Sequence, residues 1–152
     1  MKKNIAIVTG GNSSEYDISL QSAETIISNI DRSIYVPYKI VINGDQWVLK
    51  RDNEEDIAID KNDFSCILEN NKISFDCAFI AIHGTPGEDG KLQGYFDMLK
   101  IPYTTPGVLT SALTFDKDVC KNLLREYGVL SPASFLIKKE ERPAIKEILS
   151  KI

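Results

Sequence analysis

Near its start the chain carries a short apolar run, residues 5–8 (IAIV), which is followed by the glycine pair Gly10-Gly11. A continuous apolar run of this length is typical of a strand that is buried on both faces of a parallel sheet. Beyond Ile18 the apolar residues change to helical spacing, at positions 23, 26, 27 and 30. A strand, a glycine turn and a helix in this order predict the opening of a βα unit.

Strand and helix patterns continue to alternate along the chain. Pro37 suggests that the second strand has an edge position or an irregular start. Asn43-Gly44-Asp45 predicts a hairpin turn. Residues 51–75 are charged and predict surface loops with one or two short strands. The predicted strands are residues 5–8, 34–42, 47–49, 77–82, a short one within 101–108, and 131–137, and the predicted helices begin near 18 and span 88–99, 109–127 with a break near Thr114, and 140–152. This order predicts an α/β fold with an open, mainly parallel sheet flanked by helices.

The composition excludes several classes of protein. A formal net charge of -4 argues against nucleic-acid binding, which requires clustered Lys and Arg at the phosphates. The longest purely apolar run, residues 77–82, is too short to cross a bilayer. Cys66, Cys77 and Cys120 show neither paired nor metal-ligand spacing, as is usual for thiols in a reducing compartment. We therefore expect a soluble cytoplasmic protein that binds neither nucleic acid nor a membrane.

Two glycine-containing loops are expected at one rim of the sheet, because ligands of such folds bind beyond the carboxyl ends of the strands. The first loop, residues 10–15 (GGNSSE), lacks the GxGxxG pattern, so it supports no nucleotide site by itself. Glu15 stands near the start of the predicted helix, where the helix dipole favours negative charge. Its carboxylate could hold an ammonium group, or Ser14 or Glu15 could merely cap the helix.

The second loop, HGTPGEDG at residues 83–90, begins with the only histidine of the chain. Its three glycines let the backbone pass close to a neighbouring group. His83, at the end of a predicted strand, could bind a ligand carboxylate or ammonium, or could be a packed histidine with a local backbone bond. The residues leave these two interpretations evenly balanced. A zinc site is disfavoured, since the chain has no second histidine and no CxxC motif.

Lys117 and Lys121 stand four residues apart on a predicted helix face. The simpler interpretation is a solvated i, i+4 pair of lysines, interleaved with Asp116 and Asp118. The functional alternative is a lysine that contacts nucleotide phosphates.

Taken together, the segments GGNSSEYDISLQSA, HGTPGEDGKLQGYFDMLKIPYTTPGVLTSALTFDK and their separation closely resemble the amino-terminal part of D-alanine–D-alanine ligases. The resemblance runs from Ile5 to about Phe135. It implies an ATP-grasp enzyme of three domains, of which residues 1–115 would be the amino-terminal α/β substrate domain, Rossmann-like and preceding the ATP-grasp part. Residues 116–152 would be the opening elements of the ATP-grasp domain. ATP and Mg²⁺ would serve the reaction, with the metal ligands expected downstream of this chain, and the full-length family members are commonly homodimers.

The resemblance also implies roles for four residues. Glu15 matches the family's catalytic, substrate-binding glutamate, which orients the first D-alanine through its ammonium. Ile18 falls where an apolar residue lines that pocket, and His83 matches a histidine close to the first D-alanine. Lys117 matches the lysine that reaches the ATP phosphates. The chain departs from the family at Phe115, where methionine is usual, and at Thr105-Pro106, where a glycine-containing pair is common.

Three functions remain open on the sequence. One is the amino-terminal part of a D-alanine–D-alanine ligase for peptidoglycan precursor synthesis, a part that we expect to be inactive alone. Another is a ligase that makes D-alanyl–D-lactate or D-alanyl–D-serine. The last is a stand-alone α/β module that binds an amino acid without catalysis.

Overall fold

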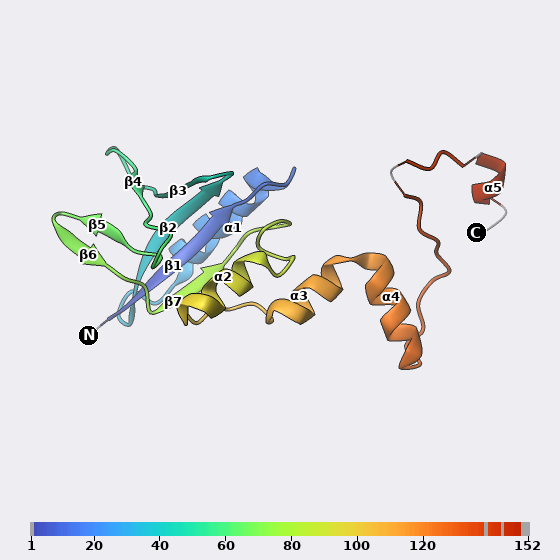
Figure 1. Cartoon of the computed structure of the whole chain (residues 1–152). Helices are drawn as coiled ribbons and strands as arrows, with labels where there is room; N and C mark the ends of the chain where they lie inside the picture. The colour runs from blue at the N-terminus through green and yellow to red at the C-terminus, as the bar shows by residue number, and fades with distance from the viewer. Residues whose placement is uncertain (1, 139, 144, 150–152) are drawn as a thin grey trace. The chain divides into compact units, whose positions relative to one another are not determined.

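The computed structural model describes residues 2–138, 140–143 and 145–149. The chain divides into two compact units, Met1–Ala112 and Leu113–Ile152 (Figure 1). The first unit contains the sheet and both glycine-containing loops. The predicted domain boundary after residue 115 falls three residues beyond this division and stays a prediction.

A five-stranded sheet in the order β4-β3-β2-β1-β7 forms the centre of the first unit. The three parallel strands are β2 (Tyr35–Asn43), β1 (Lys3–Gly10) and β7 (Cys77–Ile80), and the antiparallel edge consists of β3 (Gln46–Leu49) and β4 (Ile57–Ala58). The predicted α/β fold with a mainly parallel sheet is thereby confirmed. Pro37 lies in the half of β2 that pairs with β1 but precedes the pairing with β3, which begins at Ile40. The strand as a whole is internal, so the edge position suggested for it is wrong.

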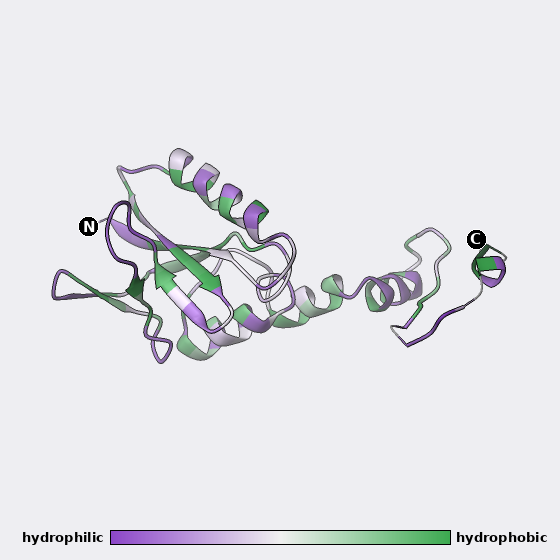
Figure 2. Cartoon of the chain, turned by 90° about the horizontal axis from the view of Figure 1, so that it is seen from above, coloured by the Kyte–Doolittle hydropathy of each residue, from purple (hydrophilic) through white to green (hydrophobic). Residues whose placement is uncertain are grey.

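The two faces of β1 pack against different elements. Ile5 and Ile7 pack on the side of α1 (Tyr16–Asn29), whereas Ala6 and Val8 face α2 (Lys91–Leu99) and the chain after β4. Alternate residues of a strand point to opposite faces, so a continuous apolar run supplies both cores. In Figure 2, the green of hydrophobic residues is concentrated along the central strands of the sheet.

An aromatic cluster closes the second face of the sheet. Phe64 is fully buried and contacts the rings of Trp47, Phe75, Tyr95 and Phe96, with centroid separations of 4.8 to 6.2 Å. Burial raises the pKa of Tyr95 to about 12, and its hydroxyl donates to the Lys61 carbonyl at 2.8 Å. The small antiparallel pair β5 (Cys66–Leu68) and β6 (Asn71–Ile73) follows Phe64, as the short strands expected between residues 51 and 75.

The helix expected over residues 88–99 begins only at Lys91. Gly90 has a φ of +88°, a left-handed conformation. Because this conformation is incompatible with a right-handed helix, α2 cannot begin before Lys91. Glu88 therefore lies before the helix, where its carboxylate accepts a hydrogen bond from the Gly84 N–H at 2.8 Å. The short strand expected within residues 101–108 is reduced to one bridge between Ala78 and Tyr103. Pro102 and Pro106 lack the N–H donors that a longer ladder would need.

Helices account for the regular structure described in the second unit. They are α3 (Val108–Phe115), which begins in the first unit, α4 (Lys117–Glu126) and α5 (Ile145–Leu149). The break between α3 and α4 confirms the interruption predicted near Thr114. The strand predicted for residues 131–137 is wrong: those residues have no regular secondary structure, and no described strand of this unit pairs with them. Of the last helix predicted, residues 140–152, residues 144 and 150–152 lie outside the described part. Among the residues that the structure describes, no helix combines the length and apolarity that a membrane crossing needs.

Candidate functional site

The two glycine-containing loops lie against each other at the carboxyl ends of β1 and β7, as predicted. The Asn12 N–H donates to the Thr85 carbonyl at 2.9 Å. Gly84 adopts a φ of +81°, and a Cβ placed there would lie 2.8 Å from the Ser13 side chain. Glycine at position 84 therefore permits both the backbone conformation and the close approach of the two loops.

Three serine hydroxyls from the first βα unit hold His83. Ser13 Oγ donates to the His83 carbonyl at 2.8 Å, and the His83 N–H donates to Ser19 Oγ at 2.9 Å. Ser22 Oγ lies 2.9 Å from Nε2 of the imidazole ring. Two of these hydroxyls also contact the backbone of Glu15. The Glu15 N–H donates to Ser13 Oγ at 3.1 Å, and Ser19 Oγ donates to the Glu15 carbonyl at 3.0 Å. Two serines thus join the backbones of His83 and Glu15 directly.

Glu15 occupies the N-cap position of α1, but its side chain makes no capping hydrogen bond. The residue is exposed, and its carboxylate has no hydrogen bond or ion pair with the described residues. Ser13 instead binds the Glu15 N–H. The carboxylate therefore remains available to a cation beside the positive end of the helix dipole. The Glu15 side chain does not cap the helix, which was the alternative role considered for it.

Ile18 lies in the first turn of α1, three residues after Glu15 and four before Ser22, and is 48% exposed. Residues at such spacings share one side of a helix. An apolar side chain is thus presented on the same side of α1 as the carboxylate of Glu15 and the hydroxyl that holds His83.

Gln93 and the three serines are the site residues that sequence reasoning missed. Gln93 is fully buried, and its Nε2 donates to the Gly87 carbonyl at 2.7 Å and to Thr105 Oγ1 at 2.8 Å. It thereby ties the second glycine loop to the turn that contains Thr105-Pro106, one of the two places where the chain departs from the family pattern. The only available signal was spacing, because Ser19 and Ser22 follow Glu15 at helical intervals.

Lys117 belongs to the second unit, where it is the first residue of α4. Asp116 caps this helix by accepting hydrogen bonds from the N–H groups of Asp118 and Val119, both at 3.0 Å. Lys117 is exposed, and its Nζ donates to the Thr114 carbonyl at 3.2 Å. The same ammonium lies 5.9 Å from the centroid of the Phe115 ring. It has no carboxylate partner among the described residues, so it suits the binding of a phosphate group.

No three His, Cys, Asp or Glu side chains in residues 2–138, 140–143 and 145–149 are arranged to hold a metal ion. The magnesium ligands that the resemblance implies are therefore not found together in this part of the chain. The groups gathered at this rim are the Glu15 carboxylate, the Ile18 side chain and the His83 imidazole. Together they suit a small molecule with charged and apolar groups better than a metal ion.

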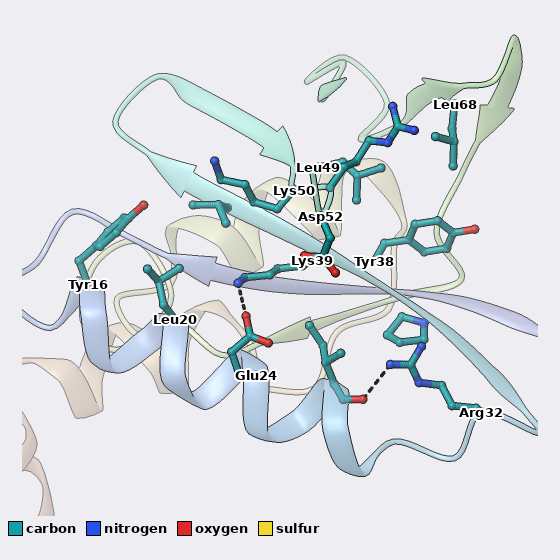
Figure 3. Close-up of a pocket in the computed structure, with 14 residues that line it drawn as sticks. Tyr16, Leu20, Glu24, Arg32, Tyr38, Lys39, Leu49, Lys50, Asp52 and Leu68 are labelled. Atoms are coloured by element: carbon teal, nitrogen blue, oxygen red, sulfur yellow. Dashed lines mark hydrogen bonds and ion pairs between the residues drawn. The ribbon is translucent and has the colours of Figure 1, made fainter. Parts of the chain in front are cut away.

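A separate pocket of about 480 Å³ lies between α1 and the β2–β3 hairpin (Figure 3). Glu24 of α1 and Lys39 of β2 form an ion pair in it. None of the three predicted substrate residues lines this pocket. It is therefore distinct from the rim at the ends of β1 and β7.

Comparison with known proteins agrees with the resemblance seen in the sequence. The family described as D-ala D-ala ligase N-terminus matches residues 4–106. The D-alanine–D-alanine ligase of Parabacteroides distasonis is 49% identical over 152 residues, which cover 100% of this chain and 46% of the relative.

Two solved structures are also similar. The D-alanine–D-alanine ligase from Coxiella burnetii has a TM-score of 0.79 at 29% identity, covering 97% of this chain and 49% of that one. The ligase from Bacillus anthracis complexed with ATP has a TM-score of 0.69 at 29% identity, covering 97% and 44%. The chain spans about half the length of the curated relatives it matches. It belongs to the D-alanine–D-alanine ligase family and contains that family's amino-terminal domain.

Proposed function

We propose that this chain provides part of the binding site for the first D-alanine in an ATP-dependent ligase. The ligase joins two D-alanines for peptidoglycan precursor synthesis. The observation that carries the proposal is the pairing of Glu15 and His83 through Ser13 and Ser19, with the Glu15 carboxylate left free. An amino acid needs an anion for its ammonium and a donor for its carboxylate, and this rim offers both kinds of group.

Each residue then has a distinct part in the reaction. Glu15 binds the ammonium of the first D-alanine and so orients the carboxylate that is to react. Ile18 contacts the methyl group, and His83 faces the carboxylate. Lys117 binds the phosphates of ATP. ATP would supply the phosphoryl group, whose transfer to this carboxylate would release ADP, and Mg²⁺ held by residues outside this chain would screen its charge. The amine of the second D-alanine would then attack the activated carboxyl carbon, forming the peptide bond and releasing phosphate and a proton.

The test is to express the complete reading frame that encodes this chain and to measure D-alanine-dependent release of phosphate from ATP. D-lactate and D-serine offered with D-alanine distinguish the two alternative ligases, because each would replace D-alanine only as the second substrate. The 152-residue chain alone serves as the control and is expected to be inactive. Phosphate release by that chain alone, or none by the complete protein with D-alanine as the sole amino acid, would contradict the proposal.

The second candidate is a stand-alone module that binds an amino acid without catalysis. It is favoured by the position of Glu15, Ile18 and His83 within the first unit. Calorimetry of the 152-residue chain with D-alanine, and with L-alanine as the matched control, tests this candidate independently of ATP.

The family resemblance also supports a cytoplasmic homodimer in the full-length protein, without nucleic-acid or membrane partners. Sedimentation of the complete protein would test the dimer.

A further inference from the structure

Ser22 has a position that none of the assigned roles explains. It lies in the second turn of α1, and its Oγ is 2.9 Å from Nε2 of His83. The backbone N–H and carbonyl of His83 are already held by Ser19 and Ser13. Ser22 therefore adds the contact that restrains the imidazole ring itself.

The other hydroxyls of α1 indicate the direction of this hydrogen bond. Ser19 and Thr25 each donate to the carbonyl four residues earlier, at 3.0 and 3.1 Å, as hydroxyls inside helices commonly do. Among the described residues, Ser22 makes no such bond, and its one protein partner is His83. Its proton is thus free for Nε2.

We propose that Ser22 is a positioning residue that donates to Nε2 of His83 and so selects the neutral tautomer with its proton on Nδ1. A neutral imidazole carries only one N–H, so an acceptor at Nε2 requires a donor at Nδ1. No described residue bonds Nδ1. The Nδ1–H remains available to a ligand carboxylate, which, resting on the proposed function, is that of the first D-alanine.

The tautomer can be observed directly, because His83 is the only histidine of the chain. The chain is labelled with ¹⁵N-histidine and studied by long-range ¹H–¹⁵N correlation. The pH is set about two units above the ordinary histidine pKa of about 6.5, so that the neutral form is observed. We expect wild type to carry the proton on Nδ1. Ser22→Ala should shift the tautomer ratio towards Nε2–H by about fivefold, the equilibrium change that corresponds to one neutral hydrogen bond.

Two variants serve as controls. Ser22→Thr keeps the hydroxyl and should keep the Nδ1–H tautomer, whereas Ser28→Ala removes an exposed hydroxyl elsewhere on α1 and should change nothing. Wild-type chain with its proton on Nε2 would overturn the proposal, and that measurement decides even if Ser22→Ala does not fold. An unchanged ratio in a folded Ser22→Ala chain would also overturn it.

A kinetic measurement separates this inference from the proposed function. In the protein expressed from the complete reading frame, Ser22→Ala should raise the KM for the first D-alanine about fivefold and leave the KM for ATP unchanged. Ser22→Thr should restore it. A tautomer shift without any change for D-alanine would overturn the assignment of His83 to the substrate while the Ser22 contact stands. A change for D-alanine without a tautomer shift would overturn the role of Ser22 while the proposed function stands.

Discussion

Replacing Gly84 by alanine tests whether the two loops of the site depend on their close approach. Gly84 has a φ of +81°, and the added Cβ would lie 2.8 Å from both Cβ and Oγ of Ser13. Ser13 would have to move, and with it the hydroxyl that accepts from the Glu15 N–H and donates to the His83 carbonyl. The substitution therefore strains the backbone and disturbs the hydrogen bonds that link Glu15 to His83.

Two effects contribute to the expected loss in the free energy of unfolding. A left-handed conformation costs a residue with a Cβ about 1–2 kcal/mol. Loss of the two Ser13 hydrogen bonds adds about 1 kcal/mol each. Gly84→Ala should thus lower the free energy of unfolding by about 3–4 kcal/mol. Gly44→Ala is the matched control, because Gly44 has a φ of +59° but nothing within 4 Å of the added Cβ. It should cost only the conformational part, about 1–2 kcal/mol.

The assay is urea unfolding of the 152-residue chain, followed by circular dichroism, with both variants measured beside wild type. A difference of about 2 kcal/mol between the variants is the quantity that reports the contact with Ser13. Equal losses for Gly84→Ala and Gly44→Ala would refute the reasoning, since an added Cβ is crowded at position 84 and meets nothing within 4 Å at position 44.

Three further outcomes are expected. In the complete protein, Glu15→Gln should weaken use of the first D-alanine by roughly tenfold or more, the range for a hydrogen bond to a charged group, while steady-state kinetics show ATP use little changed; equal losses would sink the assignment. Phe64→Ala should destabilise the chain by about 3–5 kcal/mol in urea unfolding, whereas Ile67→Ala, at a position 58% exposed, should cost far less; comparable losses would show that the aromatic cluster is not the core. Because the pKa of Tyr95 is raised to about 12 in the folded chain, its contribution to stability is complete below the unfolded value of about 10 and is lost as the pH rises towards 12. Tyr95→Phe should flatten that decline in unfolding titrations, and an identical decline would contradict the assignment.

Much of the fold could be predicted because a single physical constraint governed each segment. The apolar run ending in Gly10-Gly11 had to be a buried strand that stops at a turn, and β1 is that strand. The rule that ligand loops gather at the carboxyl ends of parallel strands also placed His83 beside the loop before Glu15, and the contacts of Ser13 confirm this proximity.

The parts that could not be predicted depend on partners far along the chain. Residues 131–137 have the composition of a strand, but a strand forms only where a neighbour accepts its backbone hydrogen bonds, and none is described beside them. Ser19 and Ser22 look like ordinary polar positions of an amphipathic helix. Only the position of His83, more than 60 residues later, shows what their hydroxyls bind.

The arrangement of these hydrogen bonds also determines which functions can be altered separately. Among the described residues, the hydrogen bonds that position Glu15 and His83 join pairs within the first unit, and the cap at the start of the Lys117 helix joins residues of the second. The geometry of the proposed D-alanine site around Glu15 and His83 therefore does not depend on contacts made by Lys117. Sites without shared partners usually contribute additively to a free energy. The proposed binding of D-alanine therefore rests on hydrogen bonds within the first unit, whereas the proposed joining of two D-alanines would also require Lys117 and the ATP phosphates.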